Sequence, residues 1–98
     1  MDSDAIISEI DRKIKTALKY CDIDYLIFIK RFDEVSDSLK FFARDNDLSV
    51  KIFDIGTDEG ISMMDECGIL DVDVPCVYSI KEESIVYYGC PDYVEELR

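Results

Sequence analysis

The sequence contains no histidine and no Cys-x-x-Cys pair, and both absences limit the metal chemistry open to it. Structural zinc sites are built from paired cysteines, or from cysteines combined with histidines, at short spacings. The cysteines here are Cys21, Cys67, Cys76 and Cys90, which are widely separated, so we expect no metal site. In a reducing compartment we expect each of them to be a free, partly buried thiol.

Long apolar runs are also missing. No stretch approaches the roughly 18 apolar residues that a membrane-spanning helix needs. The first residues, Met1–Asp4, are acidic, whereas a secretory signal peptide begins with basic residues. We therefore expect a cytoplasmic protein that does not enter a membrane. Because repeats and linkers are absent and 98 residues suit one hydrophobic core, we predict a single domain over residues 1–98.

Basic residues are scarce. The chain has 11 lysines and arginines against 23 aspartates and glutamates, which gives a net charge of −12. Nucleic-acid phosphates are bound through lysine and arginine, so we expect no nucleic acid among its partners. Residues 1–49 hold 11 acidic and 8 basic side chains, whereas residues 50–98 hold 12 acidic and 3 basic ones. We expect a protein partner that presents a basic patch to the second half of the chain.

Hydrophobic periodicity in the first two thirds of the chain predicts helices that alternate with strands. A short apolar run at Tyr25–Ile29 has the pattern of a strand buried on both faces. A second strand is predicted at Val50–Ile55, which is rich in β-branched and aromatic residues and is followed by Gly56. Helices are predicted at residues 3–20, up to the turn at 45–47, and from a cap at Thr57 or Asp58 to Gly68.

The last third predicts a β-hairpin followed by a closing helix. Strands at 77–80 and 84–88 flank a tight polar turn. Pro91 suits the first position of the closing helix, and Val94 and Leu97 are its packing residues. The predicted order is α-β-α-β-α-β-β-α, an α/β fold with a four-stranded mixed sheet flanked by helices.

Three segments resemble glutaredoxins, which belong to the thioredoxin-fold superfamily. Phe28–Ser36 is similar to the strand end and active-site loop of that family, with Lys30 three residues before the position of the nucleophilic cysteine. Val74–Tyr78 is similar to the segment that holds the family's cis-proline. Gly89–Asp92 is similar to the Gly-Cys-x-Asp stretch that holds the γ-glutamyl end of glutathione. The resemblance covers residues 24–97 and implies a thioredoxin/glutaredoxin-like fold with an added N-terminal helix.

The resemblance lacks the active-site cysteines. Asp33 occupies the position of the nucleophilic cysteine, and Ser36 occupies the position of the second one. A carboxylate does not attack disulfides as a thiolate does, so no catalytic residue is expected there. The resemblance therefore implies a redox-inactive binding or regulatory module without a cofactor, although it leaves glutathione as a possible ligand.

The family's substrate groove is the implied binding site, for an extended peptide of a partner protein or a glutathione-like ligand. The residues assigned to it are Lys30, Asp33, Val74, Pro75, Cys76, Gly89, Cys90 and Asp92. The resemblance implies a cis peptide bond before Pro75. Lys30 either holds a ligand carboxylate or pairs with Asp33, and Asp92 caps the closing helix with or without a ligand. Gly89 either has a positive φ or lets another backbone segment approach closely.

Two other functions stay open. The first is a thiol–disulfide oxidoreductase whose reactive sulfur has moved to Cys76 or Cys90, which the resemblance places side by side over the groove. Cys21 and Cys67 are instead predicted to line the core at helix ends. The second is an acidic protein that mimics nucleic acid and occupies a basic partner.

Overall fold

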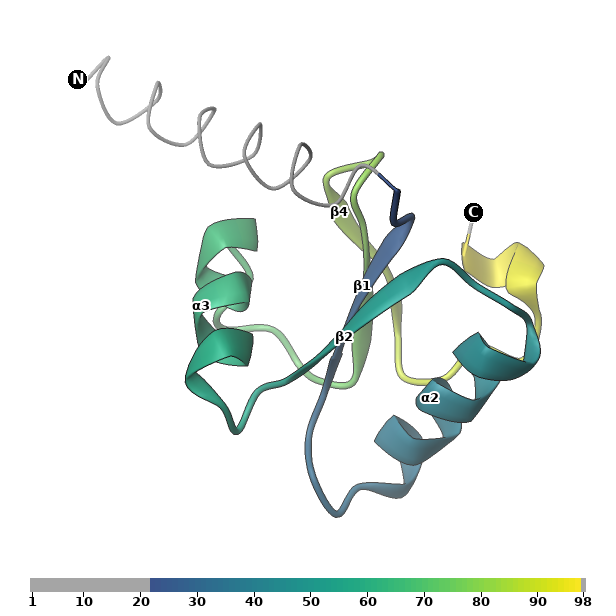
Figure 1. Cartoon of the computed structure of the whole chain (residues 1–98), viewed down its shortest axis with the longest axis horizontal. Coiled ribbons are helices and arrows are strands. Elements are labelled where there is room, and N and C mark those ends of the chain that lie inside the picture. Colours follow the sequence, from purple (N-terminus) through teal and green to yellow (C-terminus); the bar gives the residue numbers. More distant parts are fainter. Residues whose placement is uncertain (1–21, 98) are drawn as a thin grey trace.

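The structure is a computed structural model that describes residues 22–97 (Figure 1). The helix predicted at residues 3–20 and Cys21 lie outside these residues. The described elements are β1 (Tyr25–Ile29), α2 (Glu34–Asp45), β2 (Val50–Asp54), α3 (Asp58–Cys67), β3 (Cys76–Ser79), β4 (Ser84–Tyr88) and the 3₁₀ helix η1 (Val94–Leu97). Each of the predicted strands is present, with boundaries within one residue of those expected.

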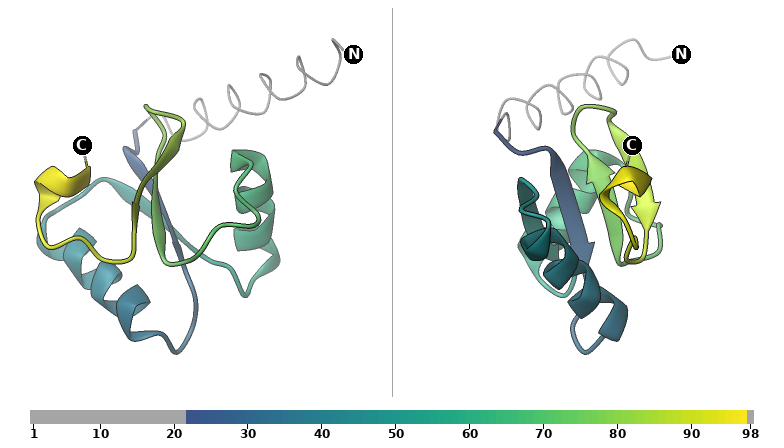
Figure 2. Two further views of the ribbon diagram at one scale, coloured as in Figure 1. Left: turned by 180° about the vertical axis from the view of Figure 1, so that it is seen from behind. Right: turned by 90° about the vertical axis from the view of Figure 1, so that its right-hand side faces the viewer.

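The strands form one four-stranded mixed sheet in the order β2-β1-β3-β4, which confirms the predicted mixed α/β architecture. β1 and β2 are parallel and are joined through α2, whereas β1 and β3, and β3 and β4, are antiparallel (Figure 2). β1 is therefore a central strand, and its Phe28 lies opposite Phe53 of β2 and Cys76 of β3. None of the helices in the described part is long and apolar enough to span a membrane.

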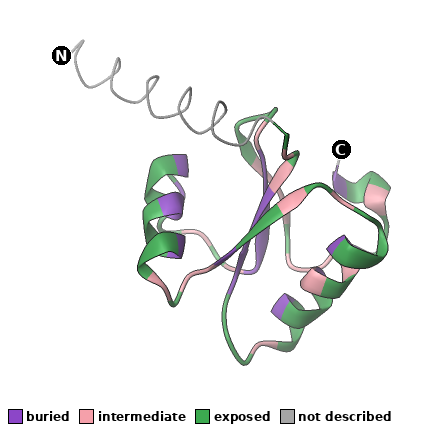
Figure 3. Ribbon diagram, in the orientation of Figure 1, coloured by how far each residue is buried: buried purple, intermediate pink, exposed green. Residues whose placement is uncertain are grey.

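The sheet separates two hydrophobic cores, because side chains alternate along β1. Leu26 and Phe28 point to one face and pack with α3, while Ile27 and Ile29 point to the other face and pack with α2. Figure 3 shows the buried central strand between the two helices. The α3-side core consists of Leu26, Phe28, Phe53, Met63, Met64, Cys67, Ile69, Cys76 and Tyr78. The α2-side core consists of Ile27, Ile29, Leu39, Ala43, Val77 and Leu97. β1 is thus buried on both faces, as its continuous apolar run predicts.

The start of α3 lies against the end of β2. Thr57 is the N-cap, and its hydroxyl oxygen accepts a hydrogen bond of 3.1 Å from the backbone N–H of Gly60. A Cβ atom on Gly60 would lie 2.0 Å from the carbonyl oxygen of Asp54. Gly68 ends the helix with a φ of 72°, a left-handed conformation that suits glycine. Both helix boundaries predicted from Thr57 and Gly68 are therefore confirmed.

The closing helix differs from the prediction. It is a single 3₁₀ turn at Val94–Leu97, and Pro91 lies three residues before it rather than at its first position. The i→i+3 hydrogen bond from Glu96 N–H to the Tyr93 carbonyl tightens this turn, and the Glu96 carboxylate accepts the Asp92 N–H at 2.8 Å. Leu97 is buried in the α2-side core as predicted. The side chain of Glu96 therefore satisfies the backbone amide of Asp92.

Candidate functional site

Three segments meet at the carboxyl end of β1, and we call this site the three-segment junction. It comprises the loop and first helical turn at 30–35, the Val74–Pro75 segment and Gly89. Gly89 N–H donates a 2.8 Å hydrogen bond to the Pro75 carbonyl oxygen, and a Cβ on Gly89 would lie 3.8 Å from Val35 Cγ1. The Val74–Pro75 peptide bond is cis, as expected. Of the two features weighed for Gly89, the positive φ is present, at 83°, and no backbone atom of another segment lies within 4 Å of where its Cβ would be.

Asp33 is the N-cap of α2. Its Oδ2 atom accepts hydrogen bonds from the backbone N–H of Ser36 at 2.9 Å and from the Ser36 hydroxyl at 2.8 Å. The buried Ser36 hydroxyl in turn accepts the backbone N–H of Lys30 at 3.1 Å. Asp33 and Ser36, singled out from sequence as a pair, are therefore joined by direct contacts that also bind the preceding loop. This network fixes the path of the chain between β1 and α2.

The contacts of Ser36 also control the ionisation of Asp33. The hydroxyl and the backbone N–H of Ser36 lower the pKa of the Asp33 carboxyl, and the nearby charge of Lys30 acts in the same direction. Among the described residues Lys30 forms no ion pair, so the direct Lys30–Asp33 pair weighed from sequence is not formed. Lys30 is exposed at the junction and remains available to a ligand.

Asp33→Ala is expected to lower Tm by about 5 °C at neutral pH, because it removes the N-cap of α2. A carboxyl whose pKa is lowered by folding stabilises the protein above its unfolded pKa, and this contribution disappears as the pH falls through the folded pKa. The difference in Tm between native protein and variant should therefore shrink below about pH 4. Circular dichroism melts across pH measure this.

The matched control is Asp33→Asn, which keeps a side-chain acceptor at the cap but removes the charge. It should recover much of the Tm at neutral pH while losing the pH dependence. A Tm difference for Asp33→Ala that stays constant down to pH 2 would contradict the assigned role of the charge.

The loop before Asp33 presents an aromatic ring to solvent. Phe32 is 104% exposed and has a φ of 57°, which is uncommon for a bulky residue. Its neighbour Arg31 is held by Asp54 at the end of β2, with 2.6 Å between Nε and Oδ2. Val35, in the first turn of α2, is also exposed. Sequence reasoning missed Phe32 as a functional candidate; the available signal was an aromatic residue in an otherwise charged loop.

Cys76 and Cys90 do not face each other, which corrects the arrangement expected from the resemblance. Cys76 is the first residue of β3, pairs with Phe28 and is 0% exposed in the α3-side core. Cys90 follows Gly89 beyond β4 and packs against the α2-side core, and its thiol donates to the Pro91 carbonyl oxygen at 3.5 Å. The sheet therefore lies between the two thiols, and Cys76 does not line the junction with its side chain.

The thiols are also held in their protonated form. Burial raises the pKa of Cys76 to about 11, and burial with the charge of Glu66 raises the pKa of Cys67 to about 12. The pKa of Cys90 is raised by partial burial and by the charge of Asp92. Because the thiolate is the reactive form, this geometry opposes a relocated nucleophile at Cys76 or Cys90. The prediction that Cys67 lines the core at a helix end is confirmed.

Thiol labelling should separate the cysteines by burial. In a Cys21→Ser background at neutral pH, a disulfide reagent is expected to label Cys90 first. Cys67 and Cys76 should react at least about 10³-fold more slowly, because their exposure requires opening of the α3-side core. Mass spectrometry of quenched samples measures the order. Fast labelling that persists after Cys90→Ser is added would contradict the described burial.

Asp92 does not occupy the cap position predicted for it. It lies two residues before η1, its side chain is exposed, and its backbone N–H is bound by the Glu96 carboxylate. The hydrogen bond described for Asp92 thus belongs to the C-terminal turn rather than to the junction. Five of the assigned residues belong to the junction segments: Lys30, Asp33, Val74, Pro75 and Gly89.

Residues 22–97 contain no group of three or more cysteine, aspartate and glutamate side chains placed to hold a metal ion. Comparison with known proteins gives no match, either to a protein-family model, to a curated protein or to a solved structure.

Proposed function

We propose that this protein is a redox-inactive relative of glutaredoxins that binds an extended segment of a partner protein at the three-segment junction. The sheet order β2-β1-β3-β4 and the positions of α2 and α3 agree with the fold that the sequence resemblance implies. A cytoplasmic location and a partner with a basic patch belong to the same proposal.

The observation that carries the proposal is the state of Asp33. It stands at the N-cap of α2, where the resemblance implies a nucleophilic cysteine, and its carboxylate is engaged by both donor groups of Ser36. A carboxylate in this position accepts hydrogen bonds and attacks no disulfide. The loop is thus well ordered by its own contacts, while the atom needed for thiol transfer is missing. A site with these properties is suited to binding rather than to turnover.

The side chains around the junction favour a peptide as the ligand. Extended peptides bind through main-chain hydrogen bonds together with pockets and anchors for alternate side chains. Val35 offers exposed apolar surface near Gly89, and Phe32 offers an exposed ring in the loop before α2. Aromatic side chains often dominate binding energy at interfaces. The net charge of −12 favours partners whose flanking residues are basic.

Selection from a random peptide library against the full chain tests this function. Enriched peptides should combine an apolar anchor with basic residues, and their binding should shift the amide NMR signals of Lys30–Ser36, Val74 and Gly89. Phe32→Ser is expected to weaken binding about tenfold or more, because it removes the exposed anchor. The matched control is Phe41→Ser, since Phe41 is an exposed phenylalanine of α2 that carries Arg44 over its ring.

The proposal would be overturned by peptides that bind the two variants with equal affinity, or by peptides that shift only the NMR signals of amides distant from the junction. The same amide spectrum, recorded with reduced and oxidised glutathione, distinguishes a peptide site from a glutathione-like one. Reduction of a glutathione mixed disulfide at the rate of an ordinary glutaredoxin would contradict the redox-inactive assignment.

A further inference from the structure

A second concave site lies at the opposite end of β1 from the three-segment junction. It begins with a row of cross-strand neighbours, because Tyr25 of β1 lies opposite Ser79 of β3, and Ser79 lies opposite Ser84 of β4. These residues, with Val86 and the end of η1, line a hollow of about 620 Å³. This volume is within the range of small-molecule binding sites. Its lining residues are Asp24, Tyr25, Ser79, Lys81, Glu82, Ser84, Val86 and Leu97.

The hollow has an apolar wall and a polar floor. Tyr25, Val86 and Leu97 belong to or pack against the α2-side core and supply the wall. The Ser79 hydroxyl accepts the backbone N–H of Glu82 at 3.1 Å, which fixes the β3–β4 turn that carries the charged side chains. Leu97 is buried, whereas Tyr25 and Val86 are only partly buried, so part of the wall is accessible in the hollow.

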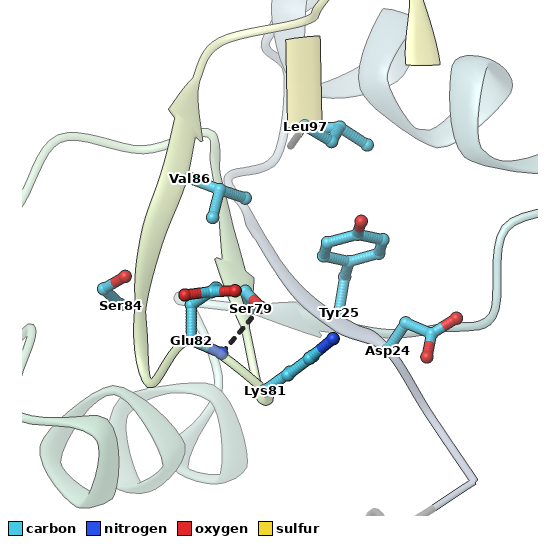
Figure 4. A pocket seen from close by; sticks show the side chains of 8 residues that line it. All are labelled: Asp24, Tyr25, Ser79, Lys81, Glu82, Ser84, Val86 and Leu97. Atoms are coloured by element: carbon cyan, nitrogen blue, oxygen red, sulfur yellow. Dashed lines mark hydrogen bonds between the residues drawn. The ribbon is translucent and has the colours of Figure 1, made fainter. Parts of the chain in front are cut away.

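Two opposite charges line the hollow without neutralising each other. Figure 4 shows Lys81 extending toward Tyr25 and the Glu82 carboxylate lying near Ser79. Within residues 22–97, neither of these charged side chains forms an ion pair or a hydrogen bond. Among the described residues, an ammonium group and a carboxylate therefore both lack a partner beside the same apolar wall.

We propose that this hollow binds a small zwitterion with an apolar body, of the class of L-amino acids with aromatic or branched side chains. The ligand's carboxylate pairs with the Lys81 ammonium, its ammonium pairs with the Glu82 carboxylate, and its apolar body packs on the wall. Tyr25 provides an aromatic surface for a ring.

Ligands that carry a single charge complement the hollow less well than a zwitterion does. An anion meets the carboxylates of Glu82 and Asp24 and the net charge of −12, which oppose its approach. A cation leaves the Lys81 ammonium as a neighbour of like charge. A zwitterion forms an ion pair with each of the two charged side chains, and its apolar portion packs on the wall.

The test is an amide NMR titration of the full chain with L-phenylalanine and two analogues. Phenethylamine lacks the carboxylate and 3-phenylpropionate lacks the ammonium. L-Phenylalanine should shift the amides of Ser79, Lys81, Glu82 and Ser84, and each analogue should bind about fivefold more weakly because one exposed ion pair is lost.

Variants assign each charge to its partner. Lys81→Gln should weaken the binding of L-phenylalanine and 3-phenylpropionate but not that of phenethylamine. Glu82→Gln should weaken the binding of L-phenylalanine and phenethylamine but not that of 3-phenylpropionate. Lys51→Gln and Glu59→Gln are matched controls, because they remove exposed charges away from the hollow. Unchanged spectra at about 10 mM ligand, or equal loss in the controls, would overturn the proposal. Either result leaves the junction proposal standing, because the two sites lie at opposite ends of β1.

Discussion

Asp33→Cys is expected to create a rapidly reacting thiol at a position where the native chain carries a carboxylate. The introduced thiolate would accept the same two hydrogen bonds from Ser36 that the carboxylate accepts now, and it would stand at the N-terminus of α2 near Lys30. Thiols in such surroundings have pKa values of about 7 or lower, against about 8.5 for a free cysteine. At neutral pH the fraction of thiolate, and with it the alkylation rate, should rise roughly tenfold.

The measurement is the pH dependence of alkylation by iodoacetamide in a Cys21→Ser, Cys90→Ser background. Asp45→Cys is the matched control, because Asp45 is an exposed aspartate at the opposite end of α2, where the helix dipole disfavours a thiolate. A thiol at position 33 that titrates like the one at position 45 would show that the junction does not stabilise an anion. If the proposed function holds, Asp33→Cys should also form a mixed disulfide with oxidised glutathione, and the Cys21→Ser, Cys90→Ser background without this substitution should not.

Gly60→Ala is expected to destabilise the protein by about 2–3 kcal/mol, although helix propensity alone predicts a gain of roughly 1 kcal/mol. The new Cβ would lie 2.0 Å from the Asp54 carbonyl oxygen and 2.6 Å from its carbonyl carbon. Both are backbone atoms of β2, so α3 must move away from the sheet. That movement pulls Met63 and Met64 out of the α3-side core.

Urea unfolding with constant m-value measures this loss. Ser62→Ala is the first control, because Ser62 is exposed in the same helix, and its effect should be within about 0.5 kcal/mol. Gly68→Ala is the second control, because its Cβ would meet no atom within 4 Å. Its free energy of unfolding should fall by only about 1 kcal/mol, the cost of a left-handed backbone at alanine. A Gly60→Ala variant as stable as Ser62→Ala would mean that β2 and α3 are not in the close contact described.

The strands and helix boundaries could be predicted because their signals are local. The Tyr25–Ile29 run, the Thr57 cap and Gly68 each specify an element through neighbouring residues alone. The face occupied by Cys76 was harder to predict. The sequence pattern starts the strand at Val77, whereas β3 starts at Cys76, and membership in the strand places a side chain on the face opposite to that of its neighbour.

The remaining differences depend on contacts distant from the residue concerned. Pro91 is compatible with the first turn of a helix. The helix instead begins at Val94, and the Glu96 carboxylate accepts the hydrogen bond of the Asp92 amide. Phe32 is fully exposed and has a positive φ, and no neighbouring residue signals that backbone conformation. The hollow near Lys81 is assembled from β1, the hairpin and η1, so no single segment reveals it.

The position of β2 at the edge of the sheet bears on how copies of this protein meet in solution. An edge strand offers unpaired backbone groups to any other strand, and Ile52 of β2 is partly exposed. Lys51 places a charge on the same strand, and Asp54 at its end is joined to Arg31, so the edge is interrupted by polar side chains along a short length. Two chains that each carry −12 also repel one another. Strand-to-strand aggregation is therefore suppressed most strongly at low ionic strength, and added salt weakens that protection.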